Sequence, residues 1–157
     1  MQTKTLPENL DGRELRVAIA VSRFNTLITE RLLAGAYEGL AALGVDIERV
    51  VAAWVPGSFE LPYAARRFAE TGRYDAVICL GCVIKGETDH NEYINHATAT
   101  ALQDVSQATG VPAIFGVVTT NTLEQALARA EEGSTNKGFE CAVAAVSMAN
   151  LRRELAE

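Results

Sequence analysis

The sequence contains little histidine and cysteine, with two histidines and three cysteines among 157 residues. His90 and His96 are six positions apart, so on one helix they would lie on different faces and could not bind one metal ion together. We therefore expect no metal site. The odd number of cysteines, in a chain for which we expect no export, indicates reduced thiols rather than disulfides.

Two of the cysteines, Cys79 and Cys82, form a C-x-x-C motif, which invites a redox interpretation. They lie within the apolar run AVICLGCVI, which is typical of a buried strand. Residues three apart on a strand point to opposite faces, so the two thiols should diverge. We expect both of them, and Cys141, to be small core residues.

Positive charge and long apolar runs are also scarce. Lys and Arg number 14 against 20 Asp and Glu, and the net charge of -6 would repel a phosphate backbone. No segment approaches the ~18 apolar residues of a membrane span. The opening MQTKTLPENLDGREL lacks the apolar core of a signal peptide. We therefore expect a cytoplasmic protein without nucleic-acid or membrane partners.

Short apolar runs and stretches of helical spacing alternate along the chain. The runs cover residues 15–21, 50–55, 74–84 and 112–118, and each is typical of a strand buried on both faces. The helical stretches between them stop at Gly44, Gly72 and Gly110. Capping boxes that begin at Asn121 and Thr122 both predict a helix up to Ala130, and a last helix should cover residues 138–155.

This alternation predicts an α/β protein: a flavodoxin-like three-layer α/β/α sandwich whose four-stranded parallel sheet carries helices on both faces. Residues 1–157 lack a linker long enough to divide them, so we expect one domain. The polar segment 1–13 has no evident place in the core. It should either fray or pair with a neighbouring subunit.

Unusual side chains follow each predicted strand. Ligands of open parallel sheets bind beyond the carboxyl ends of the strands, so these segments should meet at one edge. The segments are SRFN (22–25), PGSFELP (56–62), KGETDH (85–90) and TTN (119–121). The sequence therefore predicts a site that combines an aromatic ring, a carboxylate, a histidine and hydroxyls.

Several of these residues also have purely structural interpretations. Phe24 could be a core aromatic, Ser58 could be an N-cap, and Glu60 could complement a helix dipole. His90 is harder to explain structurally, because Asp89 to Glu92 matches a capping box that places it in the first turn of a helix. Such a helix start is a ready anion site.

Nucleotide and dinucleotide cofactors are disfavoured. The segment from Gly81 to Thr88 nearly matches a phosphate-binding P-loop, but Glu87 occupies the position of the essential lysine and would repel a γ-phosphate. No G-x-G-x-x-G follows the first predicted strand. We expect no cofactor.

Five blocks of the sequence resemble the lumazine synthase family in order and spacing over about residues 14–152. The blocks are SRFN, PGSFELP, GCVIKGETDHNEYI, FGVVTTNTLEQALARA and NKGFECAVAAVSMANL. The resemblance implies condensation of 5-amino-6-(D-ribitylamino)uracil with 3,4-dihydroxy-2-butanone 4-phosphate. The product would be 6,7-dimethyl-8-ribityllumazine, formed in the penultimate step of riboflavin biosynthesis.

The resemblance also assigns roles to individual residues. Phe24 would stack on the pyrimidine, and Val83 and Ile84 would line its pocket. The ribityl chain and ring polar groups would contact Ser58, Phe59 and Glu60. The phosphate would bind near Gly86, Glu87 and Thr88, with charge from Arg129 and Lys137, and His90 would relay protons.

In the family the site lies between adjacent subunits of a pentamer, so a neighbour would donate Phe115 and Arg129. The loop 131–137 has the length found in cage-forming relatives, so the resemblance favours a sixty-subunit shell over a free pentamer. Three features depart from the family's usual pattern and bear on phosphate affinity. They are Glu87 in place of a small residue, Asn91 in place of an aromatic, and Glu131-Glu132 in place of Gly-Thr.

Two other classes of function remain open at this point. One is a non-catalytic flavin- or pteridine-binding protein, and the other is a shell-forming structural protein. The joint presence of Phe24, Glu60, His90 and Arg129 favours an enzyme, because a pure shell needs no histidine beside a phosphate site.

Overall fold

The computed structural model describes residues 3–156, and strands alternate with helices along them as predicted. The elements are β1 (Val17–Ser22), α1 (Thr26–Ala42), β2 (Val51–Val55), α2 (Leu61–Glu70), β3 (Ala76–Ile84), α3 (His90–Thr109), β4 (Ala113–Thr120), α4 (Leu123–Arg129) and α5 (Lys137–Ala156). Two 3-10 helices, η1 (Ile47–Arg49) and η2 (Ser58–Glu60), precede β2 and α2.

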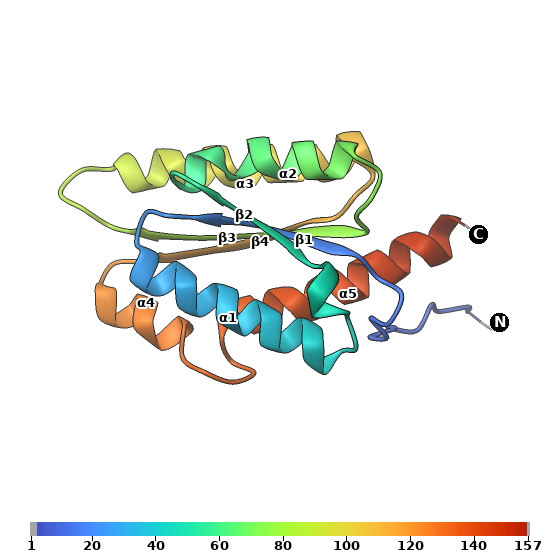
Figure 1. Cartoon of the computed structure of the whole chain (residues 1–157). Coiled ribbons are helices and arrows are strands. Elements are labelled where there is room, and N and C mark those ends of the chain that lie inside the picture. Colours follow the sequence, from blue (N-terminus) through green and yellow to red (C-terminus); the bar gives the residue numbers. More distant parts are fainter. Residues whose placement is uncertain (1–2, 157) are drawn as a thin grey trace.

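The four strands form one parallel sheet in the order β2-β1-β3-β4. Helices α2 and α3 cover one face, and α1, α4 and α5 cover the other (Figure 1). Each face packs its own apolar cluster against the sheet, with Cys79 in one cluster and Cys82 in the other. The predicted three-layer, flavodoxin-like architecture and the divergence of the two thiols are both confirmed.

The outer strands correct one part of the prediction. The inner strands β1 and β3 are almost entirely buried, whereas Val51 on β2 is 43% exposed and Phe115 on β4 is 40% exposed. The prediction that every strand is buried on both faces is therefore wrong for β2 and β4. Each of them lies at an edge of the sheet, where a neighbouring strand covers one side only.

The predicted helix ends are confirmed. Gly44, Gly72 and Gly110 have φ angles of +90°, +72° and +73°, a backbone conformation that glycine adopts easily and that ends a helix. The capping box of α4 begins at Thr122: its hydroxyl accepts a hydrogen bond from the Gln125 amide, and the Gln125 side chain accepts one from the Thr122 amide.

Helices α1 and α5 pack closely because small residues line their contact. A Cβ atom at Gly138 would overlap the carbonyl oxygen of Leu32, and one at Gly39 would lie 2.7 Å from the Cβ of Ala142. The buried Asn136 joins the two helices. Its Oδ1 accepts a hydrogen bond from the Gly138 amide at 2.7 Å, and its Nδ2 donates one to the Arg31 carbonyl at 3.2 Å. These contacts hold α1 and α5 together as one layer on their face of the sheet.

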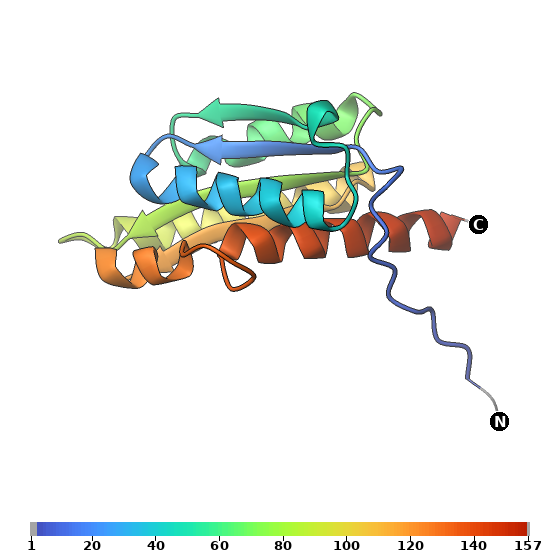
Figure 2. The ribbon, with the colours of Figure 1, turned by 60° about the horizontal axis from the view of Figure 1, so that its bottom comes forward.

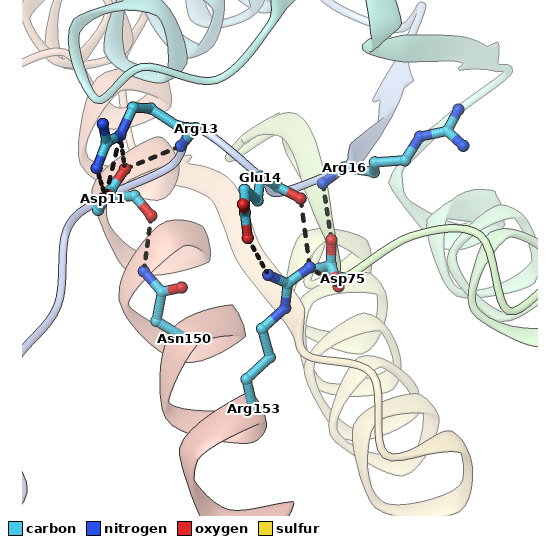
Figure 3. Close-up of polar contacts among 7 residues, drawn as sticks. All are labelled: Asp11, Arg13, Glu14, Arg16, Asp75, Asn150 and Arg153. Carbon is cyan, nitrogen blue, oxygen red and sulfur yellow. Dashed lines mark hydrogen bonds and ion pairs between the residues drawn. The ribbon is translucent and has the colours of Figure 1, made fainter.

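Residues 9–14 lie against the carboxyl-terminal half of α5, whereas residues 3–8 run away from the body of the molecule (Figure 2). The Asn150 amide donates hydrogen bonds to the carbonyl oxygens of Asn9 and Asp11 at 2.9 and 3.0 Å. Arg153 donates to the Glu14 carbonyl at 3.3 Å and pairs with Asp75 at 3.2 Å (Figure 3). The latter half of the predicted N-terminal segment is thus held by its own chain.

Candidate active site

The carboxyl ends of β1, β2 and β3 open onto a cavity of about 460 Å³. Its lining comes from the loops that follow these strands and from the first turns of α3. The lining residues are Phe24, Pro56, Gly57, Ser58, Phe59, Glu60, Cys82, Val83, Ile84, Gly86, Thr88, His90, Asn91 and Ile94. Nine of the predicted site residues therefore line one cavity.

Phe24 lies at this cavity with its ring 70% exposed, so the interpretation of Phe24 as a core aromatic is wrong. The turn that carries it is bonded to the loop after β2. The Arg23 amide donates to the Val55 carbonyl at 2.8 Å, and the Phe24 amide donates to the Pro56 carbonyl at 3.1 Å. An exposed ring on a fixed turn is suited to stacking against a planar ligand.

The segment Ser58–Glu60 forms η2, and the side chains differ in exposure. Ser58 is 6% exposed and Phe59 is 64% exposed. The carbonyl of Ser58 accepts a hydrogen bond from the buried hydroxyl of Thr98 on α3 at 3.2 Å. Because α2 has Glu60 as its N-cap and no side-chain capping bond, the interpretation of Ser58 as that cap is wrong.

Gly81 on β3 makes room for the Ser58 side chain. A Cβ atom at Gly81 would lie 2.5 Å from Ser58 Oγ and 3.2 Å from Leu61 Cδ1. Only glycine allows η2 to approach the strand this closely without a shift of the surrounding atoms.

Val83 and Ile84 end β3, and the loop that follows (yellow-green at the left of Figure 1) carries Gly86 and Thr88. His90 is the first residue of α3. The predicted capping box from Asp89 to Glu92 is wrong. Asp89 is the N-cap, but its ψ of 13° departs from the extended conformation that lets such a side chain reach the first helical turn, and it makes no capping bond. Instead, Thr88 Oγ1 accepts a hydrogen bond from the His90 amide at 3.3 Å.

Four predicted residues do not line this cavity within the chain. Arg129, exposed at the end of α4, lines a second cavity of about 520 Å³ that shares only Asn91 with the first. Glu87 is exposed on the β3–α3 loop. Lys137 pairs with Glu140 at 3.8 Å, and Phe115 lies on the outer strand β4.

Cys82 also lines the first cavity, and its side chain is buried. Burial raises the pKa of Cys82 to about 11, which keeps the thiol protonated and poorly nucleophilic near neutral pH. Among residues 3–156, no group of three or more His, Cys, Asp or Glu side chains could hold a metal ion. Within the same span, no helix has both the length and the apolar character needed to cross a membrane.

Comparison with known protein families matches residues 14–153 to 6,7-dimethyl-8-ribityllumazine synthase. The chain belongs to this family. The match covers β1 to α4, α5 up to residue 153 and every lining residue of the first cavity. The resemblance carried by the five sequence blocks is thereby confirmed for the 6,7-dimethyl-8-ribityllumazine synthase family.

Sequence reasoning missed several residues that shape the cavity. Asn25 has a left-handed backbone and donates a side-chain hydrogen bond to the Cys82 carbonyl at 2.8 Å. Thr98 supports Ser58 from a position eight residues beyond His90. Asparagine's tolerance of the left-handed region was the one signal available at Asn25. Nothing in the local sequence pairs either residue with its distant partner.

Proposed function

We propose that this chain condenses 5-amino-6-(D-ribitylamino)uracil with 3,4-dihydroxy-2-butanone 4-phosphate to give 6,7-dimethyl-8-ribityllumazine. The observation that carries this proposal is the composition of the first cavity, in a chain that belongs to the 6,7-dimethyl-8-ribityllumazine synthase family. It combines the exposed ring of Phe24, the polar segment Ser58–Glu60, the apolar wall of Val83 and Ile84, and the imidazole of His90.

These groups suit the pyrimidine substrate. A flat heteroaromatic ring can stack on Phe24 and contact Val83 and Ile84, which together make the inner part of the cavity apolar. The ribityl chain carries several hydroxyls, and the carboxylate of Glu60 and the hydroxyl of Ser58 can bind them through hydrogen bonds.

The proposed reaction consists of proton transfers between positioned partners. The primary amine of the pyrimidine attacks the ketone and water leaves, phosphate is then eliminated, and the ribityl-bearing nitrogen closes the ring with loss of a second water. An imidazole can accept and donate protons near neutral pH, so His90 can serve successive steps. Much of the rate enhancement should come from holding the two reactants together.

We further propose that a neighbouring subunit completes the site. Among residues 3–156 of one chain, no Lys or Arg lines the first cavity, although one substrate carries a phosphate. Phe115 on an outer strand and Arg129 at the end of α4 are both exposed. A pentamer can place these two side chains of one copy against the cavity of the next, and such rings can associate further into a sixty-subunit shell.

The direct test of the reaction is to incubate the purified protein with both substrates and follow the fluorescence of the lumazine product. Controls omit each substrate in turn or replace the protein with a Phe24→Ala variant. The proposal predicts product that depends on both substrates and is strongly reduced in the variant. A correctly assembled protein that binds the pyrimidine without forming product would instead indicate a non-catalytic binding protein.

A further inference from the structure

The turn after β1 contains an unusual backbone. Asn25 has φ 61° and ψ 47°, and it is the one non-glycine residue with positive φ among residues 3–156. Residues other than glycine rarely adopt this conformation, although asparagine tolerates it better than most. The conformation turns the chain from β1 into α1 immediately after Phe24.

The side chain of Asn25 bonds to the neighbouring strand β3 instead of capping its own helix. Asn25 is the N-cap of α1, yet it makes no side-chain capping bond there. Its Nδ2 donates a hydrogen bond to the carbonyl oxygen of Cys82 on β3 at 2.8 Å. Cys82 itself lines the first cavity. The bond therefore joins the turn that carries Phe24 to the strand β3, which ends at Val83 and Ile84 in the lining of the same cavity.

The turn is thus bonded on two sides. The amides of Arg23 and Phe24 donate to carbonyls of the loop after β2, and the Asn25 side chain donates to β3. We propose that Asn25 is a positioning residue that sets the distance and angle between the Phe24 ring and the wall formed by β3. This inference rests on the proposed function, in which a flat pyrimidine occupies the space between them.

Two separate requirements select asparagine at this position. The backbone requires a residue that tolerates the left-handed region, and the Cys82 carbonyl requires a donor. Glycine meets the first requirement without a side chain, and ionised aspartate has the right size and tolerance but cannot donate. The variants Asn25→Gly and Asn25→Asp therefore remove the bond while they retain the backbone conformation.

The test compares both variants with the wild-type protein in steady-state kinetics. Loss of one neutral hydrogen bond should raise the KM for the ribitylaminopyrimidine about 3- to 10-fold. The KM for the butanone phosphate should stay within about 2-fold, because its phosphate does not contact Phe24. Asn150→Asp is the matched control. It removes an amide donor to two backbone carbonyls far from the cavity and should leave both KM values unchanged.

A second readout does not depend on catalysis. Hydrogen exchange at the Phe24 amide, which is bonded to Pro56, should accelerate about 3- to 10-fold in both variants while exchange within β1 stays as in the wild type. Unchanged exchange at Phe24, or equal KM shifts for both substrates, would overturn the positioning role. Absence of product from the wild-type protein would count against the proposed function alone, since the exchange comparison still tests Asn25.

Discussion

The hydroxyl of Thr98 donates a hydrogen bond to the carbonyl oxygen of Ser58 at 3.2 Å, and both residues are buried. The bond connects α3, which begins with His90, to the segment η2 that carries Phe59 and Glu60. The bond therefore links two helical segments that both contribute residues to the lining of the cavity.

Thr98→Val should destabilise the protein by about 0.5 to 1.5 kcal/mol, because valine matches the shape of threonine but loses the bond to the Ser58 carbonyl, which keeps the Leu61 amide as its donor. Urea unfolding measures this change. Thr98→Ser retains the hydroxyl and should keep the bond, with a smaller loss from the missing methyl group. A valine variant as stable as the serine variant would show that the bond contributes nothing.

His90→Ala should reduce turnover about 10²- to 10⁴-fold without abolishing it, because general acid-base help is lost while the positioning of the substrates survives. His96→Ala is the matched control, since His96 is exposed on the same helix and lines neither cavity. The measurement is the turnover number of the wild type and of both variants at saturating concentrations of the two substrates. Complete loss of activity in an assembled His90→Ala protein would point to covalent chemistry or a structural role.

Arg129→Ala should raise the KM for the butanone phosphate far more than that for the pyrimidine. A charge-assisted hydrogen bond to phosphate contributes about 1.5 to 3 kcal/mol, which corresponds to roughly 10- to 150-fold. Arg49→Ala, at an exposed arginine of η1, serves as the control. Equal effects on the two substrates would remove Arg129 from the phosphate site.

The buried thiols predict a loss of stability in alkali. Burial raises the pKa of Cys82 and of Cys141 to about 11, and it also raises the pKa of Cys79, to which the nearby Cys141 contributes. The folded thiols stay protonated, whereas the same thiols in the unfolded chain ionise above their ordinary value of 9.0. The contribution of the buried thiols to the free energy of unfolding is complete below pH 9 and is lost as the pH rises toward about 11.

Urea unfolding of the wild-type protein and of Cys141→Ala at pH 8 to 11 tests this point. The variant lacks the titration of Cys141 and the influence of Cys141 on the pKa of Cys79, so it should lose less stability in alkali, by up to about 1.4 kcal/mol per pH unit for Cys141 itself. Identical slopes would mean that Cys141 does not contribute to the pH dependence.

A shared site predicts complementation between two defective proteins. Phe24→Ala and Arg129→Ala alter opposite sides of the proposed interface, so neither protein alone forms an intact site. Mixed rings of the two should regain intact sites at roughly a quarter of the positions. Activity assays at low butanone phosphate after dissociation and reassembly measure this recovery. A mixture no more active than its components, or an active monomer in native mass spectrometry, would contradict the shared site.

The stability of the proposed sixty-subunit shell should depend on salt. Glu131 and Glu132 are exposed in the loop between α4 and α5 and would bring like charges together where pentamers meet. Repulsion between exposed charges is strongest at low ionic strength. Light scattering should therefore show any shell loosening to pentamers as salt is removed.

Hydrophobic patterning predicted the element order and the three layers, because each apolar run was long enough to identify its strand. It could not tell inner strands from edge strands: the runs that became β2 and β4 are as apolar as those of β1 and β3, and position in the sheet depends on strand order. The carboxyl-end rule correctly gathered Phe24, Ser58 and His90. Contacts such as that of Asn25 with Cys82 depend on the folded path of the chain and have no local signature.

The most direct test of the account measures inorganic phosphate and 6,7-dimethyl-8-ribityllumazine in the same reaction mixture. The proposed condensation releases one phosphate for each lumazine formed, so the two products should appear in equal amounts and only when both substrates and the protein are present. Phosphate released without the pyrimidine, or no lumazine from a correctly assembled protein, would contradict the proposal that this cavity carries out the condensation.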